Sequence, residues 1–197
     1  LKASPQLEGY KARGIEVLLL SDPVDNFWTM TALGFDGKPF KSVTQGEADL
    51  SGFPVEGADQ DDKKEDSKAE GAPFATLLAM FKETLGDAVS DVSESARLTK
   101  SVSCLVAPTG GPDRNLEKIL AQQSNQSAGT APILEINASH ALIRNLAGKV
   151  GDKDAKPVIE DIAWLLYDSA RIVEGETPHD AAAFCERLTT SLTKALN

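Results

Sequence analysis

The sequence predicts a mixed fold of the α+β class: a small α/β unit, then a larger α+β unit. Three observations carry this prediction. An apolar run rich in branched residues, typical of a strand covered on both faces, stands at 15–20. Three short strand-like stretches in the second half are separated by helix-like stretches. Two long segments with helical periodicity end the chain. We therefore expect a short three-stranded sheet and two long C-terminal helices in the larger unit.

The first unit covers residues 1–50. After the strand at 15–20, Asp22 or Asp25 is expected to cap a helix. Asp36-Gly37 then supplies a turn. Because this unit looks incomplete and the chain has no initiator Met, we expect a fragment of a longer protein. The expected helix carries the apolar residues Phe27, Trp28, Met30 and Leu33.

The second stretch, residues 51–71, is an expected acidic linker. Its core, "EGADQDDKKEDSKAEG", contains no large apolar residue. Such a segment cannot bury enough surface to offset the entropy of ordering it, so it is a linker or the solvated start of a helix.

The larger unit covers residues 72–197. A helix through Leu77, Phe81 and Leu85 should end at Gly86. Strands are expected over 88–93, 101–107 and 132–137, and a helix over 110–123. Asn137 or Ser139 is expected to cap a further short helix.

The last two segments, 157–173 and 178–197, are the clearest helices. The first has a broad apolar stripe, and in the second Ala181, Cys185, Leu188, Leu192 and Ala195 step by four, three, four and three. The short connection between them makes the two helices antiparallel neighbours.

Composition excludes several classes of protein. A net charge of −10 argues against a nucleic-acid partner. Cys104 and Cys185 form no CxxC motif and no metal-type spacing with His140 or His179. We therefore expect both thiols to be buried in the protein, and the protein to be in a reducing cytoplasm. No apolar run approaches the length of a membrane span.

No catalytic constellation is visible. Ser139 and His140 on one turn do not make a triad, and the adjacent Glu160 and Asp161 diverge on a helix. "APTGGPDR" lacks the lysine and the spacing of a phosphate-binding loop. We therefore expect no catalytic residue, cofactor or metal site in this chain.

Three stretches carry a resemblance to a known family: "KARGIEVLLLSDPVDNFWTMTALGFDGKPFKSV", "VSESARLTKSVSCLVA" and "LEINASHALIRNL". In this order and spacing they resemble the C-terminal third of bacterial members of the heat-shock protein 90 family of molecular chaperones. The resemblance covers essentially the whole chain. The chain departs from the family at Ala138 and Ala141, where proline is frequent, and in its unusually acidic linker.

The resemblance implies a division of labour. Residues 1–50 would end a middle domain, 51–71 would be a linker, and 72–197 would form a C-terminal dimerisation domain. The family's ATP and Mg sites would lie in an N-terminal domain outside this chain. The last two helices of each subunit would form a four-helix bundle in a cytoplasmic homodimer that acts on non-native client proteins in the stress response.

Two interaction surfaces follow. The terminal helices have an apolar stripe too broad for them to cover each other, so it packs on a symmetry mate, on the sheet of its own subunit, or on both with different residues. Exposed aromatic and Met side chains suit varied partners, although Trp28 and its neighbours are equally consistent with a buried core. For the dimer interface we name Ile162, Leu165, Leu166, Cys185, Leu188, Leu192 and Leu196. For client contact we name Phe27, Trp28, Met30, Leu116, Ile119 and Leu120, the last three on a helix expected to be exposed.

Two rival hypotheses remain open. A small cytoplasmic α/β enzyme of unknown activity would need a polar pocket with convergent titratable groups. A passive dimerisation module would lack the client surface.

Overall fold

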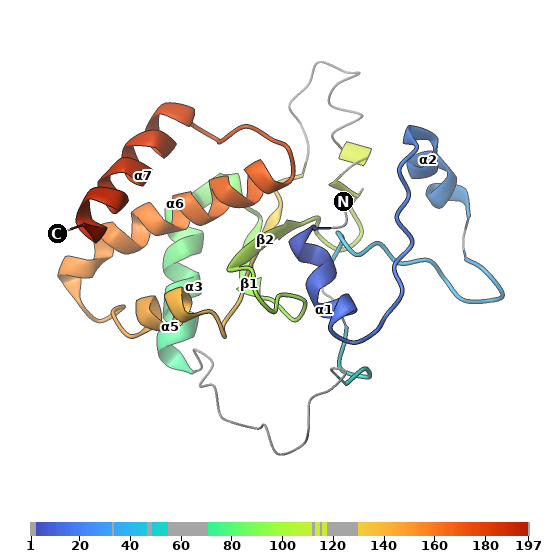
Figure 1. Ribbon diagram of the computed structural model, residues 1–197, viewed down its shortest axis with the longest axis horizontal. Coiled ribbons are helices and arrows are strands. Elements are labelled where there is room, and N and C mark those ends of the chain that lie inside the picture. Colours follow the sequence, from blue (N-terminus) through green and yellow to red (C-terminus); the bar gives the residue numbers. More distant parts are fainter. Residues whose placement is uncertain are drawn as a thin grey trace.

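The structure, a computed structural model, describes residues 3–32, 34–46, 49–54, 71–111, 113–114, 116–117 and 130–196. A three-stranded sheet and several helices form the larger part, and a thinner first part extends away from the sheet (Figure 1). This arrangement confirms the predicted mixed α+β class. The elements are α1 (Glu8–Lys11), α2 (Pro23–Thr31), α3 (Ala72–Leu85), β1 (Asp91–Glu94), β2 (Ser103–Val106), β3 (Ile133–Ile136), α5 (Ala141–Ala147), α6 (Lys156–Val173) and α7 (Ala181–Ala195), with short 3-10 turns at Pro5–Leu7, Gly86–Ala88 and Lys153–Ala155.

The sheet has the order β1-β3-β2. β3 lies in the centre, parallel to β1 with Asp91 opposite Ile133, and antiparallel to β2 with Ser103 opposite Ile136. The three strands expected from the sequence are therefore all present. They are short, as a sheet covered by helices in a small domain allows.

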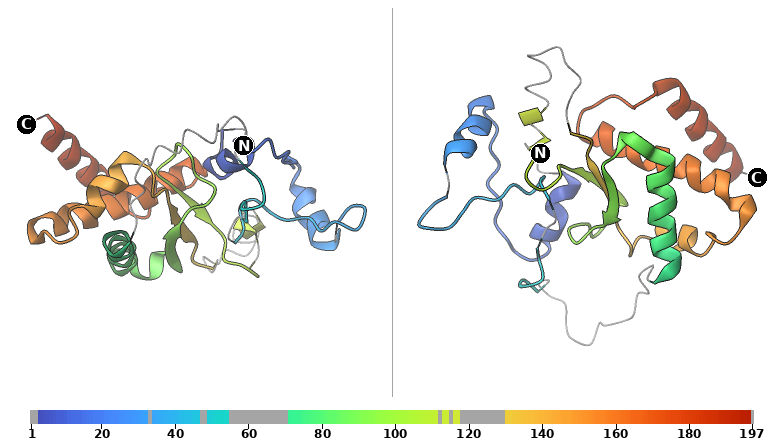
Figure 2. Two further views of the ribbon diagram at one scale, coloured as in Figure 1. Left: turned by 90° about the horizontal axis from the view of Figure 1, so that it is seen from below. Right: turned by 180° about the vertical axis from the view of Figure 1, so that it is seen from behind.

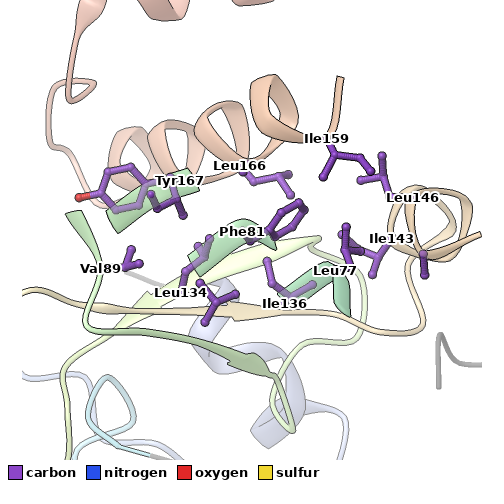
Figure 3. Close-up of a cluster of buried hydrophobic side chains, with 14 of the residues drawn as sticks. Leu77, Phe81, Val89, Leu134, Ile136, Ile143, Leu146, Ile159, Leu166 and Tyr167 are labelled. Carbon is purple, nitrogen blue, oxygen red and sulfur yellow. The ribbon is translucent and has the colours of Figure 1, made fainter. Parts of the chain in front are cut away.

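One face of the sheet packs on helices α3, α5 and α6. Figure 3 shows Phe81 and Leu166 meeting above Leu134 and Ile136 of β3. Because side chains alternate along a strand, Leu134 and Ile136 share this face while Glu135 points to the other. The buried core includes Phe74, Leu77, Phe81, Leu105, Leu134, Ile136, Ile143, Ile159, Ala163, Leu166 and Tyr167.

The first part of the chain covers the opposite side of the sheet. Gln6 donates from Nε2 to the carbonyl of Leu105 at 3.0 Å. In α1, Gly9 lies so close to the loop after β1 that an added Cβ would come within 2.6 Å of the Arg97 carbonyl oxygen. Figure 2 shows α1 beside the sheet and α2 farther out. Glycine at position 9 is what allows this approach.

The segment 42–46 extends the sheet beyond β2. The amide of Ala107 donates to the Thr44 carbonyl at 2.9 Å, and the amide of Gly46 donates to the Ala107 carbonyl at 2.7 Å. We call residues 42–46 the bridging segment.

The prediction of a strand at 15–20 is wrong. In the described part of the chain no strand lies beside these residues, and Leu18 is 71% exposed. A strand needs a hydrogen-bonded neighbour, and the apolar pattern gives no information about whether one is present. The predicted local turns do form: Asp22 and Asp25 make a capping box for α2, and Phe35 and Lys38 pair across Asp36-Gly37.

Three smaller expectations differ from the structure. α5 is capped by His140, whose Nδ1 accepts the amide of Leu142, because Asn137 instead holds the amide of Ser139. Cys185 is exposed, since the helix that carries it lies on the surface, whereas Cys104 is buried as expected. Most of the predicted linker lies outside the described residues.

Candidate interaction surfaces

Helix α6 faces the core with one side only. Ile159, Ala163, Leu166 and Ala170 recur at helical spacing and are all buried against the sheet and α3. At the two ends of the helix, Val158, Ile172 and Val173 remain exposed. α6 therefore contributes both to the core and to the surface.

Helix α7 runs back along α6, and none of its residues 181–195, all described, is buried. Arg187 joins it to α6: the guanidinium lies over the Trp164 ring at 5.4 Å, and its Nε is 3.5 Å from Asp161 Oδ1. Cys185 is exposed, and Leu188 and Leu192 are 40% and 58% exposed. The apolar stripe of α7 is therefore turned away from its own chain.

The turn between α6 and α7 is fixed by polar and ring contacts. The amide of His179 donates to Asp168 Oδ1 at 2.7 Å, and its imidazole stacks on Trp164 at 5.3 Å. Arg171 donates from Nε to the Thr177 carbonyl at 2.9 Å. These contacts, more than core packing, set where α7 begins.

The predicted dimer residues fall into two groups. Cys185, Leu188, Leu192 and Leu196 are exposed along α7, and Ile162 and Leu165 of α6 are half-buried. Leu166 differs from them: it is buried in the core of its own chain, and its place in an interface stays a prediction. Periodicity places residues on one helix but cannot separate its core-facing side from its free side.

The second candidate surface is helix α2, at the opposite end of the molecule from α7 (Figure 1). Phe27 is 44% and Trp28 47% exposed, and the Trp28 ring packs on Phe40 at 5.5 Å. Met30 lies on the same helix, but its side chain is outside the described set. The question left open for Trp28 is thus answered in favour of exposure in this chain.

The expectation of an exposed helix at Leu116 is wrong for that residue. Leu116 is only 5% exposed, and Arg114, two residues earlier, is 7% exposed and paired with Glu174 and Glu176. Ile119 and Leu120 lie outside the described residues. We withdraw Leu116 as an accessible client contact.

A buried polar cluster that the sequence did not predict joins the first part to the sheet. Arg97 is fully buried; Nη2 pairs with Glu135 Oε1 at 2.9 Å, and the guanidinium donates to the carbonyls of Val43 and Gly46. Burial raises the pKa of the Cys104 thiol well above its ordinary value, with the nearby Glu135 carboxylate adding to the effect. In sequence, Arg97 is one charge in a polar stretch, so no pattern distinguishes it.

Two features bear on a nucleotide or metal site: the glycine-containing loop after β2, and the grouping of possible metal ligands. In the glycine-containing loop, the Gly111 carbonyl accepts from Gln45 and the Asp113 carboxylate faces two hydroxyl groups, so the loop presents oxygen acceptors that repel phosphate. Among the described residues no group of three or more His, Cys, Asp or Glu side chains could hold a metal ion. No described helix is long and apolar enough to cross a membrane.

The rival enzyme hypothesis needs a pocket with convergent catalytic groups. A hollow of about 390 Å³ lies between the first part and the sheet, with Arg13, Asp49 and Glu94 in its wall. Arg13 is engaged by the carbonyls of Gly9 and Phe53, and Asp49 by Ser51, whose hydrogen bonds lower the pKa of that carboxyl. Two of the three charged groups named in the wall are therefore already engaged by neighbouring residues of the chain.

Comparison with known proteins gives a consistent result. The model of the Hsp90 protein family matches residues 1–197. The chain is 52% identical to the chaperone protein HtpG of Mesorhizobium japonicum, 51% to that of Rhizobium meliloti and 48% to that of Nitrobacter hamburgensis, each over 196 residues. These matches cover 100% of this chain and 30% of each relative.

The matches disfavour the small-enzyme alternative and agree with the resemblance in the three quoted stretches. They extend over the sheet, the two terminal helices and the first part alike. From the whole-length family match and the identities of about half, the chain belongs to the Hsp90 family of chaperones.

Proposed function

We propose that this chain is the dimerising and client-contacting portion of an ATP-dependent molecular chaperone. In this proposal residues 72–197 form the dimerisation domain, residues 1–50 complete a middle domain, and ATP with its Mg binds outside the chain. The proposal assigns no catalytic step to the chain itself. It also makes the chain cytoplasmic, as the resemblance to this family implies.

The exposed apolar stripe of α7 is the observation that supports the proposed dimer. An amphipathic helix without one buried residue in its own chain has unpartnered apolar surface. In a two-fold dimer the same stripe meets itself, and α6 and α7 of both subunits make a four-helix bundle. We assign the interface to Cys185, Leu188, Leu192 and Leu196, with Ile162 and Leu165 at its edge.

Sedimentation equilibrium over a concentration series tests the dimer. We expect the wild-type chain to have twice the monomer mass, and Leu188→Asp/Leu192→Asp to be a folded monomer, because four buried carboxylates in the dimer would have no counter-charge. A wild-type chain that stays monomeric at micromolar concentration would contradict the proposal.

The matched control is Thr190→Asp/Lys194→Gln. It changes the net charge by the same two units, and at 3.6 residues per turn both positions lie on another side of α7. Both residues are exposed. We expect this variant to keep the dimer mass. A monomer mass for Leu188→Asp/Leu192→Asp would then be caused by the change in the apolar stripe and not by the added charge.

We further propose that α2 contacts non-native proteins through Phe27, Trp28 and Met30. The support is the exposure of two adjacent aromatic side chains, the residue type that most often dominates binding energy. Ile119 and Leu120 stay in the proposal as predictions.

Suppression of client aggregation by the full-length protein tests the client surface. We expect Phe27→Ser/Trp28→Ser to weaken client binding by about tenfold or more, since losing one aromatic hot spot costs roughly 2 kcal/mol. Phe53→Ser is the control, because Phe53 is an equally exposed aromatic residue outside α2. Equal activity of both variants would remove α2 from the proposal and leave a passive dimerisation module.

A further inference from the structure

Asp113 and Arg114 are adjacent in the chain, yet their side chains bond to different parts of the molecule. Asp113 Oδ2 accepts the hydroxyl of Ser42 at 2.5 Å and that of Thr44. Arg114 donates from Nε to Glu174 Oε2 at 2.7 Å, and from Nη2 to a Glu176 oxygen at 2.7 Å. This pair of residues therefore touches both the bridging segment and the end of α6.

The bridging segment is held on its other sides as well. Its backbone pairs with Ala107 through two hydrogen bonds, and the buried Arg97 guanidinium donates to the carbonyls of Val43 and Gly46. The side-chain amide of Gln45 donates from Nε2 to the carbonyl of Gly111. Because both its backbone and its side chains are engaged, the bridging segment cannot shift without displacing residues 107–114.

The end of α6 is held in the same way. Glu174 uses its second oxygen, Oε1, to accept from Gln6 Nε2 at 3.0 Å. Glu176 lies 3.4 Å from Arg171 Nε, which also donates to the Thr177 carbonyl. Arg114 is only 7% exposed, so removal of one partner from this cluster leaves a poorly hydrated charge behind.

The position of the turn after α6 matters because it directs α7. The turn fixes the start of α7 through His179 and Asp168, whereas α7 itself buries no residue. A displacement of Glu174 and Glu176 would therefore change where α7 points more than it would change the core.

We propose that Asp113 and Arg114 are a coupling element, which links the position of the bridging segment to that of the α6–α7 turn. A movement of the first part of the chain would reorient α7, and a movement of α7 would loosen the bridging segment. Such coupling is reciprocal by thermodynamic necessity. The proposal does not rest on dimerisation, since every contact lies within one chain.

Hydrogen exchange of backbone amides in the intact chain tests the coupling from both ends. In Ser42→Ala/Thr44→Val, which removes the two hydroxyls facing Asp113, we expect the amides of 174–180 to exchange about fivefold faster or more. In Arg114→Met, which removes the ion pairs, we expect a similar acceleration for the amides of 42–46. Ser51→Ala, which removes an exposed hydroxyl of the first part bonded only to Asp49 among described contacts, should change neither.

The proposal fails if each variant accelerates exchange only at its own end. Circular dichroism reports whether these variants keep the fold. If they do not, two milder variants replace them: Asp113→Asn keeps the shape of the side chain, and Arg114→Lys keeps its charge. They must show the same two-way effect. Sedimentation of the same samples separates this result from the dimer proposal, because coupling is expected in monomer and dimer alike.

Discussion

At the scale of single residues, the Glu8 carboxylate shows how a polar contact joins distant parts of this chain. It accepts the backbone amides of Thr99, Lys100 and Ser101 at 2.8, 2.7 and 3.1 Å, and the Ser101 hydroxyl at 2.5 Å. Burial by itself would raise the pKa of Glu8, but these hydrogen bonds outweigh it and hold the pKa below its ordinary value. The folded chain therefore favours the charged form of Glu8.

This shift predicts a pH dependence with a definite sign. A carboxyl group with a lowered pKa stabilises the fold above its unfolded pKa, near 4.5, and loses that contribution as the pH falls through the folded value. At neutral pH we expect Glu8→Gln to lower the free energy of unfolding by about 0.5–1 kcal/mol, because water partly screens this incompletely buried carboxylate.

Urea unfolding from pH 7 to pH 3 measures this effect. The difference between wild type and Glu8→Gln should be constant above about pH 5 and shrink in more acidic solution. Glu16→Gln, at an exposed position of the same part of the chain, should give no such difference. A difference that grows as the pH falls would show that the sign is wrong.

At the scale of elements, α6 and α7 carry similar apolar patterns but have different surroundings. Leu166 of α6 lies in the core, whereas Leu192 of α7 is more than half exposed. Both residues fit a helical stripe of the sequence equally well. The sheet and α3 decide the difference, because they cover α6 and leave α7 uncovered.

This contrast predicts opposite effects of the same substitution. Leu166→Ala should lower the free energy of unfolding by about 2–5 kcal/mol through the cavity that it leaves. Leu192→Ala should change the stability of the single chain little, and should instead weaken self-association. Chemical unfolding at low concentration, combined with sedimentation of the same samples, compares the two; equal losses of stability would mean that α7 is packed within its own chain.

At the scale of the whole molecule, the two candidate surfaces lie at opposite ends, with the sheet between them (Figure 1). The first part reaches the sheet through Glu8, Gln6 and the bridging segment, and the sheet reaches α7 through α6 and the turn that follows it. Between the first part and the sheet these contacts are polar, with Gln6 and Glu8 side chains bonded to backbone atoms. Polar contacts thus join the first part to the sheet, and apolar packing joins the sheet to α6.

The sequence by itself determined the features that local chemistry controls. Residue periodicity was sufficient for three strands and two long helices, and turn chemistry for the Asp22 capping box and the Asp36-Gly37 turn. These features depend on residues a few positions apart, whose preferences do not need the rest of the chain. The three family stretches also come from the sequence, and the comparisons confirm the family.

Only the tertiary structure decided which apolar residues are free and which polar residues are buried. Among the described residues no strand lies beside Leu18, whereas Leu166, Leu116 and Arg97 are all buried. Each of these outcomes depends on groups tens of residues away, and the sequence pattern around each residue would read the same in either environment. Burial is a property of the packed chain, because it is set by whatever distant segment covers the residue.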